Sequence, residues 1–130
     1  MLDTSVQDKG EISKYPCPCC GYVTLQDGPG GYDICPICFW EDDLSQLRFP
    51  TGTGANKVSL IEAQNNFEAF GACERRLIEH VRKPTEEDRR APGWRKLNAN
   101  VDKIEVPEPG RDYGTSYPEN STELYYWRHR

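Results

Sequence analysis

Apolar side chains recur at intervals of three and four in the middle of the chain, which is the period of one face of an amphipathic helix. They are Leu60, Ala63, Phe67, Phe70, Leu77, Ile78 and Val81. Ser59 and Glu62 have the spacing of a capping box, and Pro84 follows the last apolar position. The pattern predicts one helix over residues 59–82. Gly71 lies on its apolar side, where we expect close packing against a neighbouring segment.

A shorter apolar pattern precedes this helix. The segments YVTL at 22–25 and YDI at 32–34 flank DGPGGYD at 27–33, which is dense in turn-forming residues. This arrangement predicts a β-hairpin. Residues 44–58 are interrupted by glycine and proline, so we expect an irregular crossover between the hairpin and the helix.

The region after the long helix is less regular. Thr85 and Asp88 have a weaker capping pattern, which predicts a short helix over residues 85–91. The segment VDKIEV at 101–106 alternates like a strand, within an otherwise irregular C-terminal extension over residues 93–130.

These elements predict an α+β fold. A small ribbon-like β-hairpin module packs on one main helix and one short helix. The 130 residues have room for one compact domain with a tail. We therefore expect an N-terminal extension over residues 1–14 and a domain over residues 15–92, with the ribbon at 15–43, followed by the C-terminal extension.

Two Cys-x-x-Cys pairs stand in the ribbon, Cys17 with Cys20 and Cys35 with Cys38. Two residues between thiolates form a turn that lets both bind one ion, and four thiolates fill the tetrahedral shell of zinc. A proline follows the first cysteine of each pair, where no N–H is needed. We predict one structural Zn²⁺ bound by Cys17, Cys20, Cys35 and Cys38. Iron in a rubredoxin-like site takes the same ligands and is the alternative.

The residues beside the two pairs differ. Gly21 directly follows the first pair, where a tight turn requires a positive φ, but Phe39 stands in that place in the second. Cys19 lies in the middle of the first pair, where the turn points its side chain away from the metal. It is either a spare thiol or an exchange ligand that replaces a neighbouring cysteine upon oxidation. Cys73 stands alone in the predicted helix, as a small buried side chain.

The ribbon carries the acidic charge of the chain. The net charge is −5, and no Lys or Arg lies between Cys17 and Cys38. A ribbon that binds nucleic acid needs such residues to neutralise phosphates, so the composition argues against DNA or RNA and favours a basic protein partner. The aromatic and basic C-terminal end either packs back on the domain or is presented to that partner. The candidate partner-binding residues are Asp27, Asp33, Glu41, Asp42, Asp43 and Trp127.

Nothing in the sequence points to an enzyme. The adjacent carboxylates of Glu41, Asp42 and Asp43 have no histidine or nucleophile beside them, and four thiolates leave zinc no position for a catalytic water. No segment reaches the ~20 apolar residues of a membrane span, and the N-terminus lacks the apolar core of a signal peptide. We expect a non-enzymatic cytoplasmic protein without a membrane partner, since reducing conditions favour metal binding by cysteine pairs over disulfides.

Four segments together resemble the bacterial CPCC family of cysteine-rich proteins over residues 15–92. They are CPCCGYVTL, YDICPICFWEDD, GANKVSLIEAQNNFEAFGACE and HVRKP. The resemblance implies a small bacterial protein with a zinc-ribbon or rubredoxin-like pair of cysteine turns. Family members look like small proteins encoded near polymorphic toxins, which implies an immunity protein that neutralises a cognate toxin by direct binding. The alternatives are a thiol or iron redox protein and a nucleic-acid-associated zinc ribbon.

Overall fold

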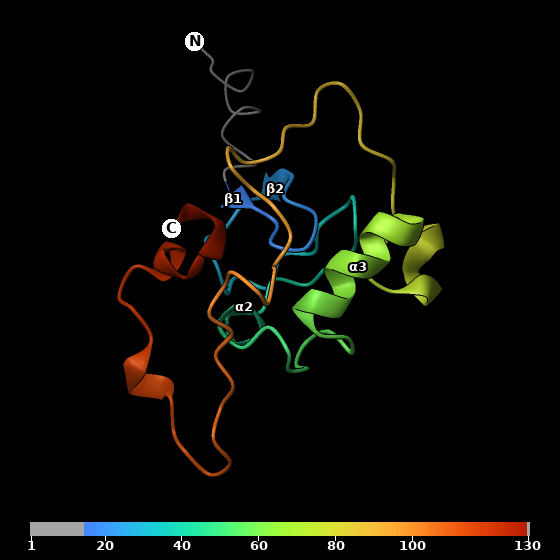
Figure 1. Ribbon diagram of the computed structural model, residues 1–130. Helices are drawn as coiled ribbons and strands as arrows, with labels where there is room; N and C mark the ends of the chain where they lie inside the picture. The colour runs from blue at the N-terminus through green and yellow to red at the C-terminus, as the bar shows by residue number, and fades with distance from the viewer. Residues whose placement is uncertain (1–14, 130) are drawn as a thin grey trace.

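The computed structural model describes residues 15–129 (Figure 1). A two-stranded hairpin, few helices and a cysteine cluster confirm the predicted α+β class. None of the helices in the described part of the chain is long and apolar enough to cross a lipid bilayer. The predicted N-terminal extension, residues 1–14, lies outside the described residues. The elements are β1 (Tyr15–Pro16), β2 (Val23–Leu25), α2 (Leu44–Arg48), α3 (Leu60–Phe70) and the 3₁₀ helices η1 (Arg75–His80), η2 (Gly114–Ser116), η3 (Ser121–Leu124) and η4 (Tyr126–Arg128).

The observed hairpin is not the predicted one. β1 pairs antiparallel with β2, so the first cysteine pair lies in the turn of the hairpin. Residues 27–33, expected to be the hairpin turn, instead form a loop in which the Asp33 carboxylate accepts hydrogen bonds from the N–H groups of Gln26 and Asp27 at 3.0 and 2.9 Å. Each cysteine pair thus closes its own short ribbon, since local pairing across a tight turn has the smaller loop-closure entropy.

The main helix begins as predicted and ends earlier. The Ser59 hydroxyl accepts a hydrogen bond from the Glu62 N–H at 3.1 Å, and α3 ends at Phe70. Gly71 follows with a left-handed φ of 86°, and its N–H bonds to the oxygen of Phe67. The prediction of a continuous helix to residue 82 is wrong because this glycine caps it. A Cβ at Gly71 would meet no atom within 4 Å, so the expected close packing is wrong as well.

The short helix predicted over residues 85–91 is also absent. The Thr85 N–H donates to the Asp88 carboxylate at 2.6 Å, but no helical turn follows. Residues 89–91 pair instead beside the first ribbon, where the Arg89 oxygen accepts from the Val23 N–H at 2.8 Å. This pairing holds the chain extended against its local helix signal. The predicted strand over residues 101–106 is irregular, and no segment within residues 15–129 pairs with it.

The C-terminal aromatic residues return to the core. Tyr125 and Trp127 are buried and stack with ring centroids 4.6 Å apart. The Tyr126 hydroxyl donates to the backbone oxygen of Arg95 and accepts from Gln64 Nε2 at 2.8 Å. The end of the chain therefore lies against the cysteine-rich domain (Figure 1).

A long loop precedes this aromatic end and extends from the body, in orange in Figure 1. Arg48 at the end of α2 ties the loop down, because its Nε and Nη2 atoms donate to the Glu105 carboxylate, each at 3.1 Å. Its guanidinium also lies 5.0, 5.1 and 4.6 Å from the ring centroids of Phe49, Tyr113 and Tyr117. These cation–π contacts hold an otherwise irregular segment.

Candidate metal centre

The first cysteine turn, residues 17–22, is closed by two backbone hydrogen bonds. The Cys17 N–H donates to the Tyr22 oxygen at 2.9 Å, and the Gly21 N–H donates back to the Cys17 oxygen at 2.7 Å. Gly21 has a φ of 81°, as its place after the second cysteine predicts. The chain thereby turns sharply enough to bring both cysteine side chains to one side. We call this turn the first knuckle.

The second knuckle, residues 35–40, repeats this geometry eighteen positions later. The Cys35 N–H donates to the Trp40 oxygen at 3.0 Å, and the Phe39 N–H donates to the Cys35 oxygen at 2.8 Å. Phe39 has a φ of 71°, so it adopts the left-handed conformation that glycine has in the first knuckle. The two knuckles are therefore related position by position, including the residue that departs from the expected glycine.

Four thiols meet between the two knuckles. All Sγ atoms of Cys17, Cys20, Cys35 and Cys38 lie within 4.8 Å of one another. The distances are 3.5 Å between the Sγ atoms of Cys17 and Cys38 and 3.7 Å between those of Cys20 and Cys35. A tetrahedral zinc ion with Zn–S bonds of about 2.3 Å places its sulfur ligands about 3.8 Å apart. The predicted ligands thus form a donor set that fits one tetrahedral ion.

Burial disfavours a negative charge on these sulfurs unless a cation compensates it. All four side chains are fully buried, and burial raises the pKa of the Cys17, Cys20 and Cys38 thiols. Hydrogen bonds from the other three cysteines lower the pKa of Cys35, and the Thr24 hydroxyl donates to its Sγ at 3.1 Å. A divalent cation would offset the charge of four thiolates, so metal binding would release the thiol protons.

The segment after α3 holds the knuckles through their backbone. The Cys73 N–H donates to the Cys38 oxygen at 2.7 Å, and the Arg82 N–H donates to the Pro36 oxygen at 3.1 Å. Farther along, Arg90 Nε donates to the Cys20 oxygen at 2.9 Å. These contacts orient both ligand turns from outside the ribbon. Sequence reasoning missed them because backbone acceptors leave no residue signature.

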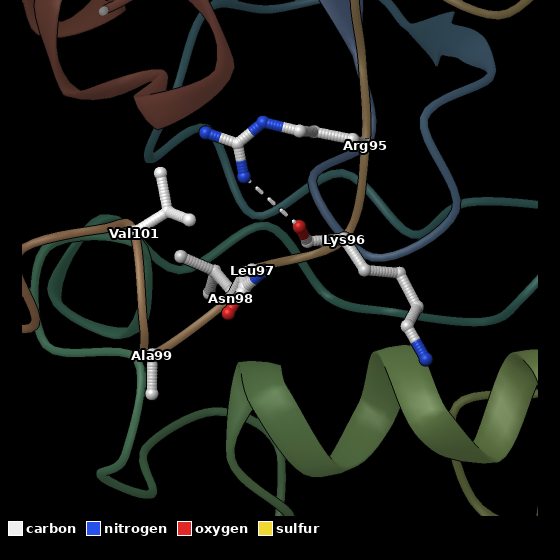
Figure 2. A pocket seen from close by; sticks show the side chains of 6 residues that line it. All are labelled: Arg95, Lys96, Leu97, Asn98, Ala99 and Val101. Atoms are coloured by element: carbon white, nitrogen blue, oxygen red, sulfur yellow. Dashed lines mark hydrogen bonds between the residues drawn. The ribbon is translucent and has the colours of Figure 1, made fainter.

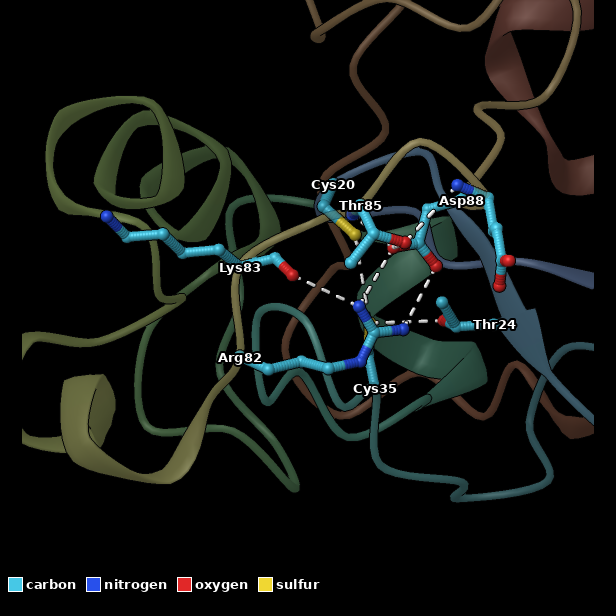
Figure 3. Close-up of polar contacts among 8 residues, drawn as sticks. Cys20, Thr24, Cys35, Arg82, Lys83, Thr85 and Asp88 are labelled. Atoms are coloured by element: carbon cyan, nitrogen blue, oxygen red, sulfur yellow. Dashed lines mark hydrogen bonds and ion pairs between the residues drawn. The ribbon is translucent and has the colours of Figure 1, made fainter.

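An arginine–carboxylate pair lies beside the thiols (Figure 3). The Arg82 guanidinium donates to both oxygens of Asp88 at 2.8 and 2.9 Å. Asp88 raises the pKa of Arg82 foremost, and the negative charge of Cys35 adds to that shift. In return, the guanidinium and the Thr85 N–H hold the pKa of Asp88 well below its usual range. A positive charge therefore faces a cluster that keeps two negative charges when four thiolates bind a divalent ion.

Cys19, which lies between the two predicted ligands of the first knuckle, is not part of the four-sulfur group. Cys19 is buried, and the residue eighteen positions later is Ile37, which is buried in the core. Cys19 thus occupies an apolar core position of the repeated turn. Alignment of CPCCGY at 17–22 with CPICFW at 35–40 carries this signal in the sequence itself. Cys73 lies after α3 rather than in it, and burial raises the pKa of its thiol to about 12.

Two of the predicted partner-binding acids lie in the interior. Asp42 and Asp43 are only 2% and 6% exposed. The Asp42 carboxylate accepts from the Gly30 N–H at 3.2 Å, and Asp43 caps α2 by accepting from the Ser45 N–H at 2.9 Å. The prediction that Asp42 and Asp43 lie on an open acidic surface is therefore wrong. Buried carboxylates are retained where they satisfy backbone donors.

The other predicted partner residues are distributed differently. Asp27 is exposed and Glu41 is half-buried, and neither carboxylate has a hydrogen-bond partner among residues 15–129. Asp33 is half-buried and uses its carboxylate within the 27–33 loop. Trp127 is 7% exposed and packs in the core. The structure thus does not bring the six residues to one surface.

An open hollow along residues 95–101 lies near α3 (Figure 2). Its charged side chains are already engaged within the chain. Arg95 donates to both oxygens of Asp102 at 2.8 and 2.7 Å, and Lys96 Nζ lies 2.6 Å from a Glu68 oxygen. The hollow therefore offers a ligand little uncompensated charge.

A comparison with curated proteins finds no match for this chain. A family model does match the part of the chain that holds the cysteines. The family model described as "Cysteine-rich CPCC" matches residues 15–88, which include both knuckles, α3, η1 and the Arg82–Asp88 pair. More than half of the chain is matched, as the resemblance over residues 15–92 predicted, and the protein belongs to the cysteine-rich CPCC family.

Proposed function

We propose that the protein is a non-enzymatic binding module for another protein, held in shape by one structural Zn²⁺. The observation that carries this proposal is the closed donor set: four fully buried cysteine sulfurs with tetrahedral spacing. Such a set saturates zinc and leaves no coordination position for a substrate or an activated water. Bound at this place, the ion would supply a cross-link between the two knuckles.

The surroundings support a structural rather than a catalytic metal. Within residues 15–129, the four cysteines are the one group of three or more His, Cys, Asp or Glu side chains close enough to share an ion. Backbone donors and acceptors, rather than reactive side chains, position the knuckles. The short strands and helices bury a modest core, so a cross-link there contributes a large part of the folding free energy.

Metal analysis of the purified full-length chain tests this proposal. We expect one zinc per chain, and we expect a strong chelator to abolish the near-ultraviolet circular dichroism of the buried tryptophans. Renewed addition of zinc restores the signal. Iron in the protein as isolated, with a reversible one-electron redox change, would replace the structural reading by the electron-transfer alternative. Retention of the fold after complete metal removal would contradict the structural role.

A narrower form of the proposal is that this module is an immunity protein that neutralises a toxin. Its support is the net charge of −5 and the absence of basic residues from the ribbon, which suit a basic partner. Native mass spectrometry of the tagged protein from its own host measures the metal and a bound protein together. A partner in 1:1 ratio whose toxicity the chain suppresses supports the narrower form. A partner that the chain binds without suppressing any toxicity supports only the general one.

A further inference from the structure

The two knuckles extend into two ribbons with the same register. In the first ribbon Pro16 lies opposite Val23, and in the second Ile34 lies opposite Glu41. Both members of each pair are separated from their counterparts by eighteen positions. The edges of the two ribbons can therefore be compared residue by residue.

The outer edge of the second strand is covered in both ribbons. In the first, the Val23 N–H donates to the Arg89 oxygen at 2.8 Å. In the second, the Asn56 side-chain amide replaces a strand. Its Oδ1 accepts from the Glu41 N–H at 2.9 Å, and its Nδ2 donates to the Glu41 oxygen at 2.7 Å. The outward N–H on this side of each ribbon is therefore bonded within residues 15–129.

The outer edge of the first strand differs between the ribbons. Pro16 is buried and has no N–H, so it cannot extend the sheet. At the equivalent position, the Ile34 N–H and C=O have no hydrogen-bond partner among residues 15–129. The bonds on either side of the Ile34–Glu41 pair, from Cys35 and Asp42, show that the backbone groups of Ile34 point away from its own ribbon. Ile34 is 48% exposed.

The surface beside this edge has the composition of a contact site. Tyr32 is 56% exposed and has a left-handed φ of 62°, which is strained for a residue other than glycine. A hollow of about 120 Å³ lies next to Ile34, Phe39 and Glu41, and its charged lining also includes Lys57 and an ion pair of Arg76 with Glu74. Residues 15–43 contain five acids and no Lys or Arg. Of these acids, Asp27 and Glu41 have carboxylates without a hydrogen-bond partner among residues 15–129, and these two charges together with the apolar groups at the open edge favour a basic partner.

We propose that the Ile34 edge binds an extended basic segment of the partner by β-strand addition, an inference that rests on the proposed protein-binding function. The Ile34 N–H and C=O supply the main-chain hydrogen bonds. Ile34 contacts an apolar side chain of the segment, and the carboxylates of Asp27 and Glu41 attract its basic side chains. The buried carboxylates of Asp42 and Asp43 take no part.

Nuclear magnetic resonance of the ¹⁵N-labelled, zinc-loaded full chain tests this proposal with two blocked heptapeptides, one alternating Lys with Val and one alternating Glu with Val. We expect the Lys–Val peptide to shift the Ile34 amide signal and slow its hydrogen exchange, with binding that weakens as salt is added. The Glu–Val peptide leaves the signal unchanged. Glu41→Lys weakens Lys–Val binding roughly tenfold.

Variants at the edge make the test specific. Ile34→Pro removes an N–H that has no internal partner, so we expect it to retain zinc and lose peptide binding. Ile34→Lys serves as a second variant if the proline prevents folding. Val106→Lys, at an exposed position of the C-terminal loop, is the matched control and binds the peptide normally.

Three results would overturn the inference: equal binding of both peptides, Lys–Val binding that survives both Ile34 variants, or protection of the Ile34 amide by a second copy of the chain. Zinc content in the same samples separates this outcome from failure of the proposed function. Absence of Lys–Val binding to the natural chain in its zinc-loaded form contradicts only the edge, whereas a natural chain that folds without zinc contradicts the structural metal.

Discussion

The two knuckles have the same backbone and place it in different surroundings. Gly21 and Phe39 have φ values of 81° and 71° at equivalent positions. At Gly21 a Cβ would lie 2.4 Å from the Trp94 ring, so a side chain is excluded. At Phe39 a side chain is present and its ring lies 5.4 Å from that of His80. One turn geometry thus needs glycine for packing in one copy and tolerates an aromatic residue in the other.

This difference separates two reasons for glycine in a turn. The left-handed conformation costs a residue with a Cβ roughly 1–2 kcal/mol. Phe39 offsets part of this cost by packing against the core and His80. Gly21 lies beneath Trp94, which covers the first knuckle together with Arg90. The first knuckle therefore depends on glycine more strongly than the second does.

The largest effect is expected when one cysteine ligand is replaced, because the metal is then lost from both knuckles at once. Cys20→Ser or Cys38→Ser takes one thiolate from the first or the second knuckle, and we expect either change to unfold the domain. Structural zinc contributes on the order of 10 kcal/mol in small peptides. Zinc content and circular dichroism measure the loss. Cys19→Ala is the control and should retain one zinc, because Cys19 lies outside the four-sulfur group. Zinc loss in that variant would make Cys19 a ligand.

The next largest effect is expected from substitutions at Gly21 and Phe39, the equivalent left-handed positions of the two knuckles. Gly21→Ala introduces both a left-handed alanine and a contact with Trp94, so we expect a loss of about 4 kcal/mol in unfolding free energy. Phe39→Gly relieves strain but removes packing, and we expect it to change stability by less than about 2 kcal/mol. Gly71→Ala isolates the conformational cost, because its φ is 86° and its Cβ position is open. Urea unfolding that gives equal losses for Gly21→Ala and Gly71→Ala would remove Trp94 from the explanation.

A smaller effect is expected at Asp42, which follows the second knuckle at the position that Thr24 has after the first. Burial raises the pKa of Asp42 from 3.8 to about 7. Since the folded state then binds more protons than the unfolded state between these values, the contribution of Asp42 to stability falls as pH rises from about 4 to about 7. Asp42→Asn should therefore be more stable than the natural chain by about 3 kcal/mol at pH 8 and differ little near pH 4. Unfolding of both proteins at each pH measures this difference, and a constant difference would show that Asp42 does not titrate in this range.

The smallest effect tests the charge beside the second knuckle. Arg82→Gln removes the guanidinium that faces Cys35, and we expect zinc affinity to fall about tenfold, as for other residues that support metal ligands. Arg95→Gln breaks a similar bidentate pair with Asp102 away from the cysteines and is the matched control. Competition with a chromophoric chelator measures both affinities. An equal loss in the two variants would assign the effect to general destabilisation.

Much of the metal centre and part of the helix could be predicted because their signals are local. Two Cys-x-x-Cys turns identify the four sulfurs, and the cap at Ser59 marks the start of α3. The predicted helix extends too far because the apolar spacing continues past Gly71, whereas the left-handed glycine ends the hydrogen-bonded helix. The same eighteen-residue repeat that places Cys19 in the core was present in the sequence, but it has structural meaning only once Ile37 is known to be buried.

The sequence by itself determined which four sulfurs make up the candidate metal site and where the main helix begins, since each cysteine turn and the helix cap depend on residues a few positions apart. Only the tertiary structure decided the rest. Pairing with the first ribbon turned residues 89–91 from a helix into an extended segment, and backbone donors drew Asp42 and Asp43 into the interior. Asn56 covers the Glu41 edge of the second ribbon, whereas no backbone group among residues 15–129 reaches the Ile34 edge. Such outcomes depend on which distant backbone groups meet, and side-chain patterns along the chain do not record those partners.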